Sequence, residues 1–149
     1  MKKLQYNSPV ILTFFLLSLG VLLLDYICRQ RTAQGTMPRN PVAVMSIVST
    51  PMAARVAEHW GVEMRRVLTG FKYIGDVMNQ LVSAGEAERF LMGFEESCGY
   101  LTGMHVRDKD AVNAALLVCE MAAHYKLEGR TLCAVMDGLY AEYGTYYTK

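Results

Sequence analysis

The stretch that decides the fold runs from Asn40 to Gly61 and reads NPVAVMSIVSTPMAARVAEHWG. Its first half, Val42–Val48, is an apolar, β-branched run of strand length, which predicts a buried strand. The tripeptide STP at 49–51 predicts a helix start, because an N-cap hydroxyl accepts from free backbone N–H groups and a first-turn proline has no N–H to leave unpaired. Gly61 ends this helix. Its apolar face consists of Ala53, Val56, Ala57 and Trp60.

The alternation of predicted strands and helices continues along the chain. Val62–Leu68 predicts a second strand, residues 74–82 predict a helix closed by Gly85, and Phe90–Phe94 predicts a third strand. Two further helices are expected, one capped by Asp108 and one starting near Thr131. The first is expected to bury Val112, Ala115, Leu116, Cys119 and Ala123, and the second Leu132, Val135, Met136, Leu139 and Tyr143. Strands alternating with helices predict an α/β layer.

Two polar loops follow predicted strands. They are Thr69–Lys72 and Glu95–Gly99, and functional loops of α/β sheets gather beyond the carboxyl ends of strands. On an extended segment Glu95 and Ser97 point to the same side, so a carboxylate and a hydroxyl could bind neighbouring sugar hydroxyls. Glu96 would face the other way, toward solvent or a salt bridge. Ordinary loop polarity or a helix cap would also explain these two residues, and this alternative to a sugar site stays open.

Other polar residues carry weaker signals. Gly70 and Lys72 offer backbone amides and a cation for sugar oxygens or a phosphate, although a solvated lysine is the simpler interpretation. His105 or Lys109 could transfer protons only if burial shifted its pKa toward neutrality. His59 and His124 are interpreted as structural.

Composition narrows the class of protein. The chain has 149 residues, is 52% hydrophobic and carries a formal net charge of +1, which fits one globular domain and argues against disorder or a nucleic-acid partner. The four cysteines lack CxxC or histidine-paired spacing, so neither a disulfide framework nor a metal site is predicted. Reduced thiols in a cytoplasmic protein are expected.

The amino end has a different character. Lys2 and Lys3 precede an apolar run, Val10–Leu24. As a helix these residues span about 22 Å, less than the roughly 30 Å of a bilayer core. A signal-peptide core, a membrane-associated segment and a buried helix all fit this run.

Four segments in order resemble the bacterial phosphoglucomutase/phosphomannomutase family, the α-D-phosphohexomutases. They are NPVAVMSIVSTPMAARVAEHWG (Asn40–Gly61), VLTGFKYIG (Val67–Gly75), FLMGFEESCGYL (Phe90–Leu101) and VRDKDAVNAALLVCEMAAHYK (Val106–Lys126). The resemblance implies four α/β domains around a cleft, with this chain covering most of domain III, a three-layer mixed sheet flanked by helices. It also implies interconversion of hexose 1-phosphate and hexose 6-phosphate, of glucose or mannose, through a phosphoserine and with Mg²⁺.

The resemblance further implies roles for particular residues. Glu95 and Ser97 match the family's sugar-reading glutamate and serine. Thr69, Gly70 and Lys72 match a second sugar loop, Lys109 a lysine near the reacting oxygens, and Arg107 the arginine beside it. Lys109 is therefore the candidate catalytic residue, and the others are candidate substrate-binding residues.

The sequence departs from the family in ways that limit its activity. The phosphoryl-carrying serine loop, the DGDxDR loop that would bind Mg²⁺ and the fourth domain's phosphate clamp are missing, so the chain alone is expected to be inactive. We divide it into a hydrophobic helix, 1–27, and a domain III-like part, 28–149, with domains I, II and IV absent. About the first 20 residues look foreign to the family and weakly rhomboid-like, which suggests a chimeric junction. A membrane-tethered interaction protein without catalysis, and a fragment without function, remain alternatives.

Overall fold

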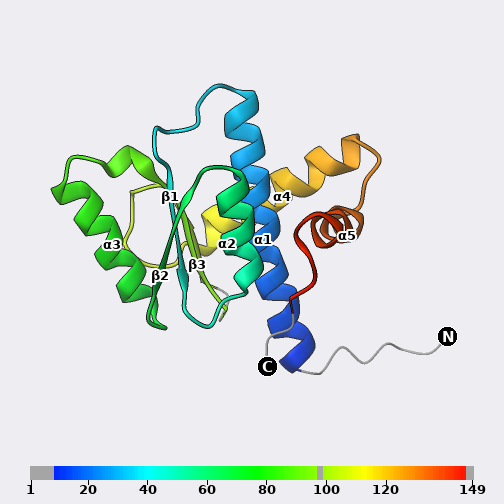
Figure 1. Ribbon diagram of the computed structural model, residues 1–149, viewed down its shortest axis with the longest axis horizontal. Coiled ribbons are helices and arrows are strands. Elements are labelled where there is room, and N and C mark those ends of the chain that lie inside the picture. The colour runs from blue at the N-terminus through cyan, green and yellow to red at the C-terminus, as the bar shows by residue number, and fades with distance from the viewer. Residues whose placement is uncertain (1–8, 97–98, 147–149) are drawn as a thin grey trace.

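The computed structural model describes the backbone of residues 9–96 and 99–146, and side chains from Ser18 onward within those ranges. Four strands form one sheet in the order β2-β1-β3-β4 (Figure 1). β1 pairs in parallel with β2 and β3, whereas β4 pairs antiparallel with β3. The strand bounds are Val42–Ser46 for β1, Glu63–Val67 for β2, Phe90–Glu95 for β3 and Gly99–Thr102 for β4.

Helices cover both faces of this sheet. α3 packs on one face, while α1 and α2 pack on the other, with α4 and α5 next to α1 (Figure 1). The helix bounds are Pro9–Ala33 for α1, Pro51–His59 for α2, Phe71–Ser83 for α3, Ala111–Leu127 for α4 and Leu132–Tyr143 for α5, with a short 3-10 helix, η1, at Ala87–Arg89. The predicted three-layer α/β fold is therefore confirmed.

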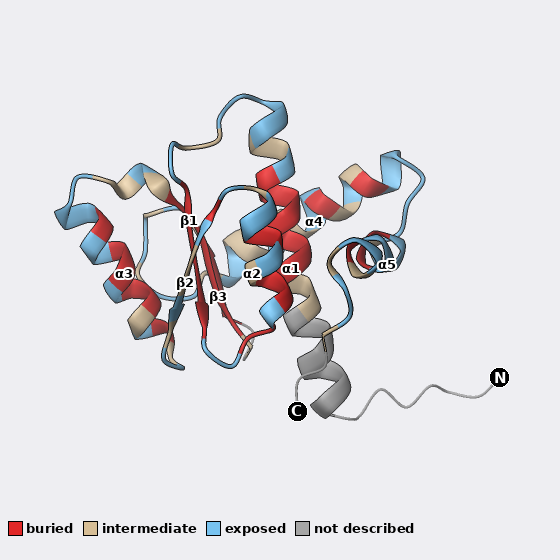
Figure 2. Cartoon of the chain, in the orientation of Figure 1, coloured by how far each residue is buried: buried red, intermediate tan, exposed pale blue. Residues whose placement is uncertain are grey.

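The central strand explains why two separate cores form. Every residue of β1 is buried (Figure 2). Because side chains alternate along a strand, Val42 and Val44 join the core under α3, whereas Ala43 and Met45 join the larger core under α1 and α2. An apolar run that is buried on both faces is typical of parallel strands in α/β proteins.

The opening motif folds largely as predicted. The Thr50 hydroxyl accepts a hydrogen bond from the Met52 backbone N–H at 3.3 Å, and Pro51 is the first residue of α2. The strand is shorter than predicted, because β1 ends at Ser46 and the next two residues, Ile47 and Val48, lie exposed in a turn. The start of α5 after Thr131 is also confirmed, since the Thr131 hydroxyl accepts from the Ala134 N–H at 3.1 Å.

The prediction for α4 was wrong in two respects. The N-cap is Asp110, not Asp108, because the Asp110 carboxylate accepts from the Asn113 N–H at 2.9 Å. The face expected to point inward is exposed, including Val112, Leu116 and Cys119, and the buried residues are Met121 and Tyr125. This helix is apolar on both sides, so helical periodicity cannot identify its inner face.

α1 contains the apolar run Val10–Leu24, for which a membrane contact was one of the predictions. Residues 20–28 are all buried, and Val21–Leu24 belong to the core shared with α2 and β3. A Cβ at Gly20 would come within 2.7 Å of the Phe94 ring, so glycine lets α1 approach the sheet closely. No helix in the described part of the chain combines the length and apolar character needed to cross a membrane.

The predicted division between 27 and 28 falls inside α1. The helix continues across it to Ala33, and core residues lie on both sides of it, with Tyr26 and Ile27 on one side and Cys28 on the other. The membrane contact predicted for Val10–Leu24 is not supported, because the apolar side chains described from Leu19 onward pack inside this domain. A foreign origin of the first residues stays a prediction.

The described cysteines should differ sharply in reactivity. Cys28 is buried, and this burial raises the pKa of its thiol to about 12, whereas Cys119 and Cys133 are exposed. Because the thiolate is the reactive form, we expect a maleimide to modify two thiols of a Cys98→Ser variant rapidly and Cys28 only after unfolding. Mass spectrometry of the labelled peptides checks this. Rapid labelling of Cys28 in the folded chain would contradict its placement in the core.

Candidate functional site

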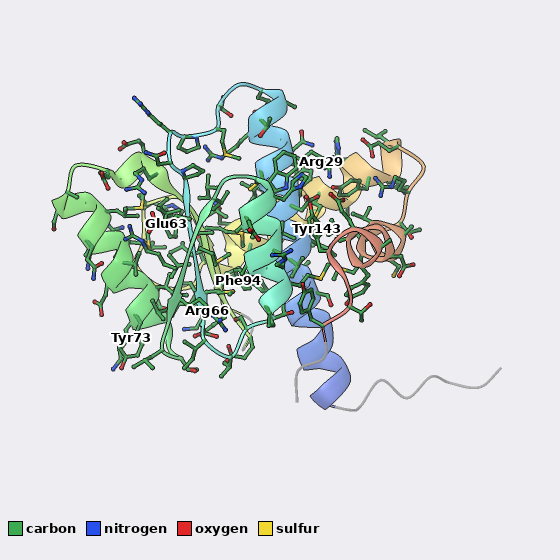
Figure 3. The ribbon with its side chains drawn as sticks, in the orientation of Figure 1. Arg29, Glu63, Arg66, Tyr73, Phe94 and Tyr143 are labelled. Carbon is green, nitrogen blue, oxygen red and sulfur yellow. The ribbon has the colours of Figure 1, made fainter. Side chains whose placement is uncertain are left out.

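The carboxyl ends of three parallel strands meet at one edge of the sheet. Ser46, Val67 and Glu95 are the last residues of β1, β2 and β3. α2 and α3 begin at the same edge, and Figure 3 shows Arg66 of β2 and Tyr73 of α3 close to it. Ligands of open α/β sheets bind beyond this edge. The two loops singled out from the sequence therefore lie where a site is expected.

Glu95 lies at this edge, and its neighbours cover almost all of it. It is the last residue of β3 and pairs with Gly99, the first residue of β4. Its side chain is 4% exposed, and a Cβ at Gly99 would come within 2.7 Å of Glu95 Cγ. The sequence prediction placed Glu95 in an open loop because β4, only four residues long, was not predicted. Pairing with β4 is what covers the Glu95 side chain.

Phe71 connects Glu95 with Lys109. A Cβ at Gly99 would also come within 3.0 Å of Phe71 Cδ2, so Glu95, Gly99 and Phe71 pack together. The Lys109 ammonium lies over the Phe71 ring, 5.3 Å from its centroid, and 3.0 Å from Asp108 Oδ1. A cation over an aromatic face is attracted by the ring quadrupole. The structure thus brings two residues implied by the family resemblance to the same buried ring.

Lys109 has a solvated environment. Its side chain is 44% exposed, so the burial that a proton-transfer role would require is not present. The Lys109 backbone N–H and ammonium, both bonded to Asp108, hold the pKa of the Asp108 carboxyl below its usual value. His105 is also exposed and bonds to Asp110 at 2.7 Å. This arrangement suits electrostatic contact with an anionic ligand better than proton transfer.

The other predicted residues divide into two groups. Thr69 and Gly70 precede α3 at the edge, and Gly70 has φ +122°, a backbone conformation that favours glycine. Lys72 lies in the first turn of α3 and not in the predicted loop; it is exposed, with its ammonium 4.9 Å from the centroid of the neighbouring Tyr73 ring. These residues remain candidates at the edge.

Arg107 is directed elsewhere. Its guanidinium donates to Asn79 Oδ1 at 2.9 Å and to the Met104 carbonyl at 2.6 Å, so it ties its loop to the middle of α3. Ser97 lies outside the described residues, and its predicted partnership with Glu95 stays a prediction. Phe71 was missed by the sequence analysis. Its position directly after Gly70, in the second sugar loop, was the available signal.

Two cavities among the described residues lie away from this edge. One, of about 200 Å³, is apolar and lies between α1 and α5, with Leu22, Met136 and Tyr140 in its wall. The other, of about 160 Å³, lies between α1 and α4 and includes Gln30, Thr102 and Glu120. Neither is lined by Glu95 or Lys109.

The described residues offer no fit for a resident metal. Within residues 9–96 and 99–146, no three His, Cys, Asp or Glu side chains gather where one ion could be held. The Mg²⁺ implied by the family would therefore need ligands from outside this part of the chain.

Comparison with known proteins identifies the family. A family model described as phosphoglucomutase/phosphomannomutase, alpha/beta/alpha domain III, matches residues 18–143. The chain belongs to this family. The phosphoglucomutase of Staphylococcus aureus strain bovine RF122 / ET3-1 is 36% identical over 128 residues, covering 86% of this chain and 22% of that protein. That of Staphylococcus haemolyticus is 34% identical over 131 residues, covering 88% of this chain and 23% of that protein.

Solved structures show the same fold. A protein of Thermus thermophilus, provisionally assigned as a phosphomannomutase, matches 83% of this chain and 25% of its own, with a TM-score of 0.61 at 23% identity. Parafusin, a Paramecium phosphoglucomutase in its open form, matches 85% of this chain and 21% of its own, with a TM-score of 0.62 at 22% identity. This chain thus corresponds to domain III and spans about a fifth of the length of the curated phosphoglucomutases it matches.

Proposed function

We propose that this chain supplies the sugar-recognition surface of a mutase that interconverts hexose 1-phosphate and hexose 6-phosphate, with glucose or mannose as the hexose. The observation that carries the proposal is that Glu95 and Phe71 both lie against Gly99 at the carboxyl edge of the sheet, with the Lys109 ammonium over the Phe71 ring. A carboxylate accepts hydrogen bonds from neighbouring hydroxyls, and an ammonium attracts the oxygens of a sugar phosphate. We place this function in the cytoplasm.

The proposed role is positioning and not bond making. Glu95 is held by β4 and Phe71, and a fixed acceptor loses little entropy when it binds a sugar hydroxyl. Lys109 adds positive charge beside it, while the backbone at Gly70 would contact the sugar from α3. Phosphoryl transfer depends on positioning and on charge stabilisation, and in the proposed enzyme the remaining mutase domains provide the phosphoryl group and its metal.

A domain graft tests this function. Residues 18–143 would replace the matching segment of the Staphylococcus aureus phosphoglucomutase, and the graft would be assayed with glucose 1-phosphate and Mg²⁺. We expect the graft to form glucose 6-phosphate and the isolated chain to form none, because the isolated chain lacks the phosphoryl carrier. A graft that folds by circular dichroism but shows no turnover, or an active isolated chain, would contradict the proposal.

A further inference from the structure

Glu96, the residue after Glu95, makes a short hydrogen bond at this edge. Glu96 Oε2 accepts a hydrogen bond from Ser46 Oγ at 2.6 Å, and Ser46 Oγ lies 3.0 Å from Ser49 Oγ. Ser46 and Ser49 are 1% and 2% exposed. The sequence predicted that Glu96 faces solvent or a salt bridge, whereas in the structure it bonds to Ser46 of a buried pair of serines.

The chemistry of these groups fixes the direction of the hydrogen bonds. A carboxylate only accepts, and a serine hydroxyl has one proton to donate. Since Ser46 donates to Glu96, Ser49 must donate to Ser46 in the 3.0 Å contact. Without the Glu96 carboxylate, the Ser46 hydroxyl would lose the acceptor of its proton inside the protein, which is unfavourable.

The same contact ties the end of β3 to the end of β1. Glu95 is the last residue of β3, and Glu96 follows it directly in a turn. Glu95 packs against Gly99, and Glu96 bonds to Ser46, the last residue of β1. Holding Glu96 in place therefore limits rotation of the backbone that carries Glu95.

We propose that Glu96, through Ser46, is a positioning residue that fixes the end of β3 and so holds Glu95 at the edge where the hexose would bind. This inference rests on the proposed function. Glu96 does not touch the sugar; it acts by fixing the backbone direction at the end of β3. Ser46 is its partner, and Ser49 completes the hydrogen-bond chain.

Kinetics of the grafted mutase test this role. We expect Glu96→Ala and Ser46→Ala each to lower kcat/KM for glucose 1-phosphate about 10-fold, and the double variant to lose about as much as either single one, because both remove the same hydrogen bond. Glu96→Gln should recover most of the loss, since its amide oxygen can still accept from Ser46. Glu88→Ala, an exposed acidic residue of η1, is the matched control and should be unaffected.

The outcomes separate the positioning role of Glu96 from the proposed function. Unchanged kinetics of Glu96→Ala, or losses in the two single variants that simply add, would overturn the positioning role. So would a Glu96→Gln variant as impaired as Glu96→Ala with an unchanged melting temperature. Should Glu96→Ala fail to fold, Ser46→Ala, which removes only one oxygen atom, decides the question alone. Unchanged kinetics of Glu95→Ala in the same graft would instead overturn the proposed function.

Discussion

Glu95→Ala in the grafted mutase is expected to lower kcat/KM for both glucose 1-phosphate and mannose 1-phosphate by about 100-fold. Hydrogen bonds to a charged group contribute about 1.5–3 kcal/mol each, and about 1.4 kcal/mol corresponds to a factor of ten. Glu95 is 4% exposed and lies against Gly99. In the Glu95→Ala variant, a water molecule would therefore not be held in the position of the missing carboxylate as an oriented acceptor. Coupled assays of the two hexose 6-phosphate products measure the effect.

Two further variants make this result specific. Glu95→Gln keeps the size of the side chain and one acceptor oxygen, so its loss should be smaller than that of Glu95→Ala. Glu88→Ala removes an exposed carboxylate from η1, next to the opposite end of β3, and should leave kcat/KM unchanged. If Glu95→Ala behaved like Glu88→Ala, the edge of the sheet would have no part in sugar recognition.

Asp25→Ala is expected to reduce the free energy of unfolding of this chain by about 3 kcal/mol, because it removes two hydrogen bonds to a buried carboxylate and leaves the Trp60 indole N–H without its acceptor. Asp25 is 1% exposed. Its Oδ1 accepts from the Trp60 indole N–H at 2.9 Å, and its Oδ2 accepts from Arg29 at 3.3 Å. This carboxylate therefore joins α1 to the residue that ends α2. Urea denaturation followed by tryptophan fluorescence measures the change.

Controls separate the buried carboxylate from acidic residues in general. Asp76 lies exposed on α3, and surface substitutions usually change stability by less than about 0.5 kcal/mol. The free energy of unfolding of Asp76→Ala should therefore be close to that of the parent chain. Arg29→Ala should cost less than Asp25→Ala, because the Arg29 side chain is half exposed and Asp25 would keep its bond to Trp60. Equal stability of Asp25→Ala and the parent would show that Asp25 does not join the two helices.

Local sequence signals predicted correctly those helix starts that depend on neighbouring residues alone. Thr50 and Pro51 mark the start of α2 by their own chemistry, and the structure places the helix there. The inner face of α4 could not be predicted in this way, because Val112 and Leu116 are as apolar as the buried Met121. In that helix the tertiary neighbours, and not the periodicity, decide which side is buried.

Contacts that the local sequence does not signal account for what was missed at the site. β4 has four residues and only one described partner strand, β3, so its sequence carries little signal of its own. Without β4, the burial of Glu95 could not be anticipated. The contacts of Lys109 with Phe71, and of Asp25 with Trp60, join residues far apart in the chain. Resemblance to the family suggested the proposed roles of Glu95 and Lys109, but not the Phe71 ring that Lys109 covers.

Amide chemical shifts of the isolated chain, titrated with glucose 1-phosphate at millimolar concentrations, test most directly whether domain III of this protein carries a hexose site. Sugar contact at the carboxyl edge predicts shift changes at 69–72, at Glu95 and Glu96 and at Lys109. Leu22 and Met136, which line the apolar cavity between α1 and α5, should not change. Shift changes confined to that cavity, or a spectrum unaltered at the edge, would contradict the account.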